Sequence, residues 1–407
     1  MNKNHAVLAV FIIAFLARIA ALAVLPERGI TGDSQSYDDL AVRIAQGHGY
    51  TSSLAPDLPA TRRLPGYPVF LAVIYFIFGH SLAAVKILQF ILDSSTCVLL
   101  YKTAELLFGK RIALWAALLA ALYPPYILFA NFILSEALYL FLVALSGYLM
   151  VKGFKGEGKR DLILSGFFMG ISNLVRSTLM LFPAALFVAL ITFAKRSRKR
   201  LAVSFAIFIS CMVLAMSPWI IRNYLCFHKI MLSHQGLGWA LWVGSTDFKD
   251  QFYPHWDQEP VKSMIKDANS VDDIDRIFLP KAIKNITQNP FAYITLIMKK
   301  FFSFWTIPYG LDLVSAKSEL LGILYRLFYY VVFFFFLAGV FLADKKERAI
   351  SAILILMLYF SVFHAILIME PRYSFPVNLY IFIFAAFGFQ NFSNIFNLKR
   401  GHNNATK

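Results

Sequence analysis

The feature that most constrains this chain is a series of apolar runs, each about 20 residues long, separated by polar connections. A run of that length crosses the hydrocarbon core of a bilayer as an α-helix. Of the 407 residues, 59% are hydrophobic and only 15% are charged, whereas a soluble domain carries roughly 25% charged residues. The sequence therefore predicts an all-α polytopic membrane protein.

Ten membrane-spanning helices account for these runs. We expect them at residues 6–25, 81–107, 112–128, 132–151, 161–176, 178–194, 201–220, 322–342, 349–368 and 374–392. The first run also resembles a secretory signal peptide, but its length favours retention as a helix.

Basic residues gather in alternate connections between the spans and in the C-terminal tail. Connections rich in lysine and arginine face the cytoplasm, so we expect both termini inside. The net charge of +16 then reflects orientation in the membrane and attraction to anionic membrane lipid. Nucleic acid is not an expected partner.

Two long connections break the pattern of short hairpins, and both lie on the external side. Residues 26–80 form the first, which ends in GYPVFLAVIYFIFG, at about 14 residues a short stretch for a span. Residues 221–321 form the second, which contains FAYITLIMKKFFSFW, an aromatic stretch interrupted by two lysines. Both stretches predict helices in the membrane interface, and the first also fits a re-entrant helix. The chain reads as one membrane domain over residues 1–407.

The first external loop contains the acidic sequence GDSQSYDD, with Asp33, Asp38 and Asp39. On a helix that begins near Asp33, the side chains of Asp33 and Tyr37 share a face, while Asp39 faces elsewhere. One interpretation is that Asp33 is a general base that deprotonates a hydroxyl or an amine. The other is that these carboxylates cap the helix and are otherwise solvated. The residues alone leave both interpretations open.

Later in the same loop, the sequence TRRLPGYP places Arg62 and Arg63 before a rigid turn. Guanidinium groups bind phosphate oxygens in a bidentate manner, which suits a lipid phosphate at the membrane surface. Arginines beside an interfacial helix also snorkel toward water without binding a ligand. The pair is therefore a candidate phosphate site with a purely structural alternative.

Further polar side chains fall at the external ends of later spans. They are Asn131, Ser135, Glu136, Arg176, Arg222, Glu370, Arg372 and Tyr373. Ionisable groups at or within membrane spans are costly and mark function by default, although each alone also serves as an end anchor. Because all of these residues lie on the external side, we expect them to converge on one site.

Charged residues also occur within the spans themselves. Lys86 and Asp93 share one face of the second span, for which an intramembrane proton relay is one interpretation. Arg18 in the first span is expected to snorkel or to pack. The sequence contains neither a P-loop nor a zinc-protease motif, so nucleotide hydrolysis and metalloprotease chemistry have no support.

Several motifs follow one another in a recognisable order. They are GDSxxYxxLA, GxGY and RxPGYPxFLA in the first loop, then ALYPPYILFANFILSEALYLFL, SPWIIRNY and ExRYxxP. From about residue 6 to residue 392 this series resembles the GT-C glycosyltransferases. It is most similar to the bacterial glycosyltransferase family 39 branch, which is related to protein O-mannosyltransferases and to the aminoarabinose transferases of lipid A. Each motif is loose by itself, and their shared order makes the resemblance fairly specific.

The resemblance implies a GT-C bundle of about ten transmembrane helices with interfacial helices in its external loops. It implies an enzyme that takes a sugar from a polyprenyl-phosphate donor on the external face. The acceptor would be an envelope lipid, glycan or protein. The location would be the bacterial cytoplasmic (inner) membrane. The active site, formed by loop 26–80 and the polar residues that converge with it, would face the periplasm or exterior.

Carried over by position, Asp33 matches the acidic residue proposed as catalytic base in this family, and Arg63 matches a basic residue associated with the donor phosphate. The substrate-binding residues that we expect are Tyr37, Asp38, Arg62, Arg63, Tyr67, Glu136, Arg176, Arg222, Glu370, Arg372 and Tyr373. Where the mannosyltransferases have an Asp-Glu pair, this chain has Asp33-Ser34. The participation of a second carboxylate or of a divalent metal ion therefore stays open, and no cofactor is otherwise indicated.

Two other functions fit part of the pattern. A transporter or flippase of a lipid-linked sugar also places charges in its spans, but it usually shows internal repeats and broken helices at the bilayer midplane. The second is a non-catalytic envelope protein that only binds a polyprenyl lipid. The position of the charges at external helix ends favours the transferase.

Overall fold

The computed structural model describes residues 3–23, 29–53, 55–61, 63–156, 159–193, 198–231, 237–246, 259, 261–266, 271–308 and 318–404. Helices dominate these residues. Their one sheet is a hairpin of two short antiparallel strands, β1 (Thr51–Ser52) and β2 (Ala55–Pro59). The predicted all-α membrane fold is confirmed, and the hairpin is an addition that the sequence pattern did not indicate.

Seven helices among the described residues are long and apolar enough to cross a membrane. They lie in α1 (Lys3–Leu22), α4 (Leu82–Phe108), α7 (Glu136–Gly156), α10 (Arg198–Phe227), α16 (Glu319–Leu342), α17 (Arg348–Ile366) and α18 (Phe375–Asn404), the last together with the 3-10 turn η2 (Pro371–Ser374). A bent pair, α5 (Lys110–Ala121) and α6 (Pro124–Ala130), forms an eighth span if both parts cross together. The bend of 54° falls at Pro124, because proline donates no backbone hydrogen bond and restricts the residue before it.

The predicted count of ten spans is not confirmed. The expected fifth and sixth spans correspond to α8 (Lys159–Val175) and α9 (Phe182–Phe193), which have 17 and 12 residues. Between them Arg176 is extended and the short 3-10 turn η1 (Ser177–Leu179) follows. The apolar stretch is interrupted at this point because the Arg176 side chain binds polar partners, which are described below.

Small residues let the helices of the bundle approach closely. Gly166 and Gly170 of α8 face the backbone of α10 so tightly that an added Cβ atom would overlap a carbonyl oxygen. Gly339 of α16 and Gly388 of α18 lie against each other in the same way. Such contacts are typical of helix pairs in membranes, where van der Waals packing drives association.

A buried ion pair joins α1 to α4. The Nε atom of Arg18 donates to Asp93 Oδ2 at 2.6 Å, and the side chains are 0% and 2% exposed. The same guanidinium donates to the carbonyl of Ala121, at the bend between α5 and α6 (2.6 Å). Arg18 is thus a packing residue and does not snorkel. Asp93 has Arg18 as its partner, so this ion pair gives Asp93 a structural role beside the proton relay that the sequence left open.

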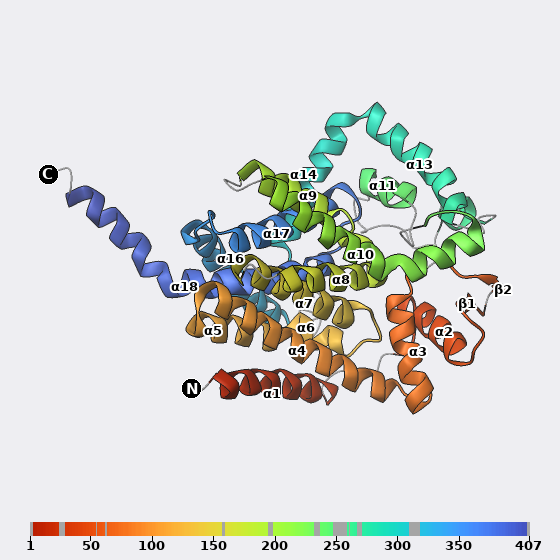
Figure 1. Cartoon of the computed structure of the whole chain (residues 1–407), viewed down its shortest axis with the longest axis horizontal. Coiled ribbons are helices and arrows are strands. Elements are labelled where there is room, and N and C mark those ends of the chain that lie inside the picture. The colour runs from red at the N-terminus through yellow and green to blue at the C-terminus, as the bar shows by residue number, and fades with distance from the viewer. Residues whose placement is uncertain are drawn as a thin grey trace.

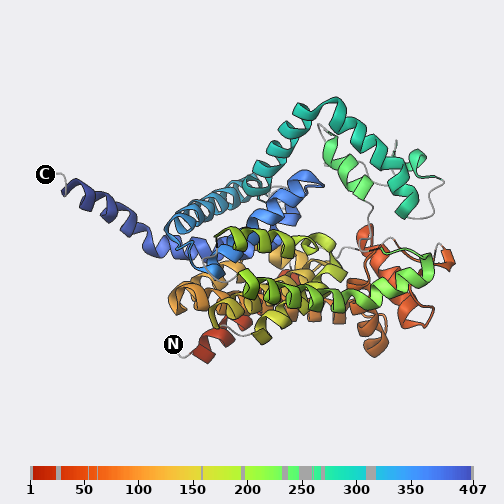
Figure 2. The same cartoon turned by 45° about the horizontal axis from the view of Figure 1, so that its top comes forward.

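The two ends of the bundle differ in what they carry. Both termini lie at one end, whereas α2 (Asp33–Ala45), the hairpin and α3 (Gly66–Phe78) lie at the other (Figure 1). An additional layer stands above that second end in Figure 2. It consists of α11 (Leu237–Ser245), α12 (Val261–Met264) and α13 (Val271–Gln288), and α14 (Pro290–Thr306) leads from it back to the bundle.

This additional layer has a small apolar core of its own, built around Trp239, Trp242 and Phe278. It is attached to the bundle through Lys300 of α14, whose ammonium group donates to the carbonyls of Gly244 (2.7 Å) and Leu367 (3.0 Å). The two predicted interfacial stretches are indeed helices, α3 and α14, of 13 and 17 residues. Their position in the membrane interface stays a prediction.

Candidate active site

A cluster of acidic and basic side chains lies at the end of the bundle that carries α2 and the hairpin. Its members come from segments far apart in the sequence, and ion pairs join them to one another. We call this group the charged cluster; it consists of Asp33, Arg63, Glu136, Arg176, Glu370 and Arg372. The predicted convergence of polar residues on one site is thus seen for these six.

The first part of the charged cluster is the pair of Asp33 and Arg63. Asp33 is the first residue of α2, and its Oδ1 atom lies 2.5 Å from an Nη atom of Arg63. The Nε atom of Arg63 donates to Ser36 Oγ (2.9 Å), and the guanidinium lies 4.7 Å from the ring centre of Tyr37. Asp33, Ser36 and Tyr37 are three and four positions apart, so one face of α2 surrounds the arginine.

Arg372 connects the two halves of the chain. One of its Nη atoms lies 3.6 Å from Asp33 Oδ2, and the other lies 3.6 Å from Glu136 Oε1. Its Nε atom forms an ion pair with Glu370. Arg372 and Glu370 belong to η2 and its N-terminal flank, so the turn before α18 brings the end of the chain to the first loop.

The third part of the charged cluster is the pair of Glu136 and Arg176. Glu136 begins α7, and its Oε1 atom lies 2.5 Å from an Nη atom of Arg176. The Nε atom of Arg176 donates to Ser135 Oγ at 3.1 Å. The second carboxylate oxygen of Glu136, Oε2, is buried and has no hydrogen-bond partner.

The charges of the cluster balance, with three carboxylates facing three guanidinium groups. Burial alone would raise the pKa of Asp33, but the positive charges of Arg63 and Arg372 outweigh it and lower that pKa to about 2. Asp33 lies at the solvent-accessible edge of the cluster, because its side chain is 42% exposed, whereas that of Glu136 is 4% exposed. Asp33 is therefore an ionised carboxylate within reach of an incoming molecule.

Five of the predicted substrate-binding residues that the structure describes are not members of the charged cluster. Tyr37 and Tyr373 lie against its arginines, whereas Asp38, Tyr67 and Arg222 have other hydrogen-bond partners. Asp38 accepts hydrogen bonds from Tyr75 and His80 instead (2.6 and 2.8 Å). Tyr67 is fully buried and donates to Gln89 Oε1 at 2.6 Å. These contacts give Asp38 and Tyr67 a role in packing α2, α3 and α4 together, and none of them supports the predicted contact with substrate.

Arg222, the third, holds the first external loop in place. Its guanidinium donates to the backbone carbonyls of Tyr50 and Ala60 (both 3.1 Å) and stacks on Trp219. Tyr50 in turn donates its hydroxyl to the carbonyl of Arg63 (2.9 Å). Arg222 therefore positions Arg63 through Tyr50, and does not itself join the cluster. The other predicted residue of this loop, Arg62, lies outside the described residues.

Two residues of the site were not predicted, Ser36 and His364. Ser36 accepts a hydrogen bond from Arg63, and its spacing from Asp33 would have indicated it, whereas Ser135, which accepts one from Arg176, was among the residues expected to converge. His364 of α17 stacks on Tyr373, with ring centres 4.5 Å apart, and its Nδ1 atom lies 3.0 Å from the carbonyl of Ile368. This stack holds the segment that carries Arg372. No sequence spacing points to His364, because its contact depends on the turn between α17 and η2.

A metal ion was left open by the sequence. Within the part of the chain that the structure describes, no group of three or more His, Cys, Asp or Glu side chains is arranged to hold one. The carboxylates of the charged cluster each face an arginine instead. The described residues therefore do not form a ready-made metal site.

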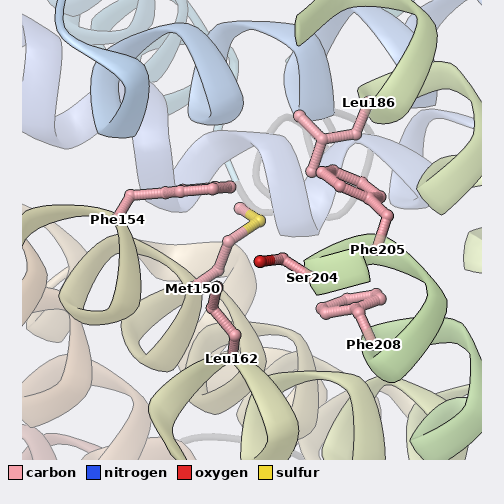
Figure 3. A pocket seen from close by; sticks show the side chains of 7 residues that line it. All are labelled: Met150, Phe154, Leu162, Leu186, Ser204, Phe205 and Phe208. Atoms are coloured by element: carbon pink, nitrogen blue, oxygen red, sulfur yellow. The ribbon is translucent and has the colours of Figure 1, made fainter. Parts of the chain in front are cut away.

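A small hollow lies between α7, α8, α9 and α10 (Figure 3). Its wall is apolar except for Ser204, and it includes Met150 and Phe154 from the last part of α7. Glu136 is the first residue of the same helix. Because α7 rises about 1.5 Å per residue, the hollow and the charged cluster lie at opposite ends of the bundle. The hollow is not part of the candidate site.

The chain is thus a polytopic helical bundle with a charged site at one end, built from the first loop and the turn before the last helix. Residues 59–221 match the family described as dolichyl-phosphate-mannose-protein mannosyltransferase. No curated protein matches the sequence. The family match covers less than half of the chain, and it agrees with the resemblance to the GT-C glycosyltransferases that the sequence motifs indicated.

Solved structures share the fold at low sequence identity. ArnT from Cupriavidus metallidurans, bound to undecaprenyl phosphate, matches with a TM-score of 0.56 and 14% identity, over 94% of this chain and 59% of that protein. The oligosaccharyltransferase of Archaeoglobus fulgidus in its apo form matches with a TM-score of 0.58 and 15% identity, over 99% of this chain and 52% of that protein. The same archaeal protein, AglB, in complex with an inhibitory peptide and a dolichol-phosphate, gives 0.57 and 14%, again over 99% and 52%. This chain thus spans 52% to 59% of the length of these proteins.

Proposed function

We propose that this protein is a glycosyltransferase that moves a sugar from a polyprenyl-phosphate donor to an acceptor of the bacterial cell envelope, with Asp33 as the general base. The observation that carries the proposal is the meeting of Asp33 with Arg63 and Arg372. A base and a pair of guanidinium groups are what displacement of a phosphate from an anomeric carbon requires. The lipid phosphates bound by ArnT and AglB support the donor class.

In this proposal Arg63 and Arg372 bind the phosphate of the donor. The bond between the anomeric carbon and the phosphate oxygen breaks while a hydroxyl or amine of the acceptor forms the new bond. The departing phosphate takes the electron pair of the broken bond, and the two guanidinium groups stabilise its charge. Asp33 accepts the proton of the acceptor. One displacement of this kind inverts the configuration at the anomeric carbon.

Binding of the donor would also strengthen the base. The low pKa of Asp33 comes from the charges of Arg63 and Arg372. A phosphate that takes both guanidinium groups for itself neutralises them, and the desolvation of Asp33 then raises its pKa. Asp33 becomes a better proton acceptor when the donor is in place. The exchange of partners therefore couples donor binding to activation of the base.

The accessible side of Asp33 is where we place the acceptor. The positive-inside pattern assigns this end of the bundle to the external face of a bacterial cytoplasmic membrane, where nucleotide sugars of the cytosol do not reach. A lipid-linked sugar on that face is the donor that fits. The acceptor is a lipid, glycan or protein of the envelope that approaches from outside.

The test is transfer by the purified protein. Wild type in lipid nanodiscs is incubated with undecaprenyl-phosphate-linked, radiolabelled sugars and with envelope lipid, glycan and protein fractions. Label should move from the donor lipid to one fraction, with release of undecaprenyl phosphate in equal amount. Absence of transfer from every donor would overturn the proposal. Movement of intact donor across a sealed bilayer without transfer would instead indicate a flippase.

A further inference from the structure

One atom at the centre of the charged cluster has no partner. Glu136 Oε1 is approached by both Arg176, at 2.5 Å, and Arg372, at 3.6 Å, but Oε2 is buried and accepts no hydrogen bond. A buried polar atom without a hydrogen bond costs about 1–3 kcal/mol, and more when it belongs to a charged group. Such a position is expected to be filled when a molecule that supplies a hydrogen-bond donor is bound.

Arg372, the neighbouring arginine, is held loosely enough by Asp33 and Glu136 to change partners when that molecule binds. The Nη atoms of Arg372 lie 3.6 Å from Asp33 Oδ2 and 3.6 Å from Glu136 Oε1, and both distances are longer than a hydrogen bond. Arg176 is held more tightly, by Glu136 at 2.5 Å and by Ser135 at 3.1 Å. If Arg372 turns toward a phosphate, it leaves Glu136 with Arg176 alone. The carboxylate then has one arginine fewer to balance its charge, so a hydrogen-bond donor on the molecule attached to that phosphate can take that place.

The depth of Glu136 distinguishes the two substrates. Asp33 lies at the accessible edge with a side chain 42% exposed, and the acceptor must reach it there. The side chain of Glu136 is 4% exposed and lies beyond Arg372 from Asp33. A group bound to Glu136 therefore belongs to the substrate that enters first and fills the inner part of the site, which is the sugar joined to the donor phosphate.

We propose that Glu136 selects the donor sugar, because its Oε2 atom accepts a hydrogen bond from a hydroxyl or ammonium group of that sugar. The inference rests on the proposed glycosyl transfer and adds the residue that recognises the donor sugar. A carboxylate gains a charge-assisted hydrogen bond from a hydroxyl and an ion pair from an ammonium group. A sugar that lacks the group leaves Oε2 buried without a partner, so the site discriminates against it.

The experiment compares donors that lack one hydroxyl each. Wild type, Glu136→Gln and Ser135→Ala are assayed with undecaprenyl-phosphate mannose, undecaprenyl-phosphate glucose and their monodeoxy analogues. For wild type we expect one deoxy position to lower kcat/KM by about 10⁴-fold or more, because the analogue leaves a buried polar group of the site unpaired. Glu136→Gln should lower kcat/KM for the parent sugar and reduce the deoxy penalty to within about threefold. Ser135→Ala removes the other partner of Arg176 but keeps the carboxylate, so its deoxy penalty should equal that of wild type.

Binding of undecaprenyl phosphate without a sugar separates this role from misfolding. Its Kd should not rise in Glu136→Gln, because this variant keeps the proposed phosphate contacts Arg63 and Arg372 and removes a carboxylate that competes for Arg372. An equal deoxy penalty in wild type and Glu136→Gln would overturn the inference, as would a wild type that tolerates every deoxy donor. If kcat/KM depended on Glu136 only when a hydroxyl was removed from the acceptor, and not from the donor, the inference would also be overturned. Absence of transfer from any donor would defeat the proposed function itself, a different result.

Discussion

Asp33 and Arg372, near opposite ends of the sequence, lie with Oδ2 of the carboxylate 3.6 Å from an Nη atom of the guanidinium. This contact closes the site, because it joins the first external loop to the turn that precedes the last helix. Arg63 lies on the other oxygen of the same carboxylate, at 2.5 Å. The carboxylate that we propose as base is thus held by the two arginines that we propose as phosphate ligands.

Replacement of Arg63 should weaken donor binding. In Arg63→Ala the phosphate loses one of its two guanidinium ligands, and a charge-assisted hydrogen bond contributes about 1.5–3 kcal/mol. We expect the Kd for undecaprenyl phosphate to rise by about 10- to 100-fold, measured by titration in nanodiscs. Arg43→Ala is the matched control, because Arg43 lies on α2 and binds Thr51 at a distance from the cluster. An unchanged Kd in Arg63→Ala would rule out the phosphate role.

The pairing of Asp33 should appear as a dependence of stability on pH. Its pKa is lowered from 3.8 to about 2 in the folded protein, so the ionised carboxylate favours folding. This contribution is fully present above about pH 4 and is lost as the pH falls toward 2. The difference in thermal unfolding temperature between wild type and Asp33→Asn should stay constant from pH 7 to pH 5 and shrink below pH 4. A difference that disappears between pH 7 and pH 5 would show that Asp33 is not paired.

Tyr50 should affect activity without touching substrate. Tyr50→Phe keeps the ring contact with Trp219, with ring centres 4.9 Å apart, but removes the hydroxyl that binds the carbonyl of Arg63. One hydrogen bond contributes about 0.5–1.5 kcal/mol, so the Kd for undecaprenyl phosphate should rise by about two- to tenfold. Tyr224→Phe on α10 serves as the control. If Tyr50→Phe binds undecaprenyl phosphate as wild type does, Arg63 is positioned by other contacts.

The buried pair of Arg18 and Asp93 should be structural. Removal of one partner leaves a charge without its counter-ion in the bundle, which costs about 3–5 kcal/mol. Arg18→Met and Asp93→Leu should each lower the unfolding temperature in detergent strongly, and the double variant should recover most of the loss. Lys86→Met should change little, because Asp93 binds Arg18 at 2.6 Å. If Lys86→Met is as destabilising as Arg18→Met, the assigned pairing is wrong.

The sequence predicted the membrane fold and most of the charged cluster for one physical reason. Apolar runs of about 20 residues indicate spans, and charges are so unfavourable in a bilayer that those at external span ends tend to meet. Glu136 and Arg372 were found in this way, whereas Asp33 was indicated by the acidic first loop and by the family resemblance. The loss of two full-length spans could not be predicted, because α8 and α9 end where Arg176 turns toward Glu136.

Helical geometry places Asp38 away from the charged cluster, and tertiary structure does the same for Arg222. Asp38 follows Asp33 by five positions, which is a rotation of about 140° on a helix, so it faces Tyr75 and not the cluster. Arg222 could not be placed, since its partners are backbone carbonyls of Tyr50 and Ala60 at the base of a hairpin with a two-residue strand. A strand of that length leaves no periodic pattern in the sequence.

The most direct test of the account is the rate of sugar transfer by Asp33→Asn. The variant keeps the shape of the side chain but removes the carboxylate that accepts the proton, and general base catalysis contributes about 10²- to 10⁴-fold. Asp57→Asn, at an exposed position of β2, is the matched control. With the donor and acceptor that wild type uses, Asp33→Asn should be slower than wild type by about 10²-fold or more, and Asp57→Asn should equal wild type. Equal rates for Asp33→Asn and wild type would contradict the central claim that Asp33 is the catalytic base.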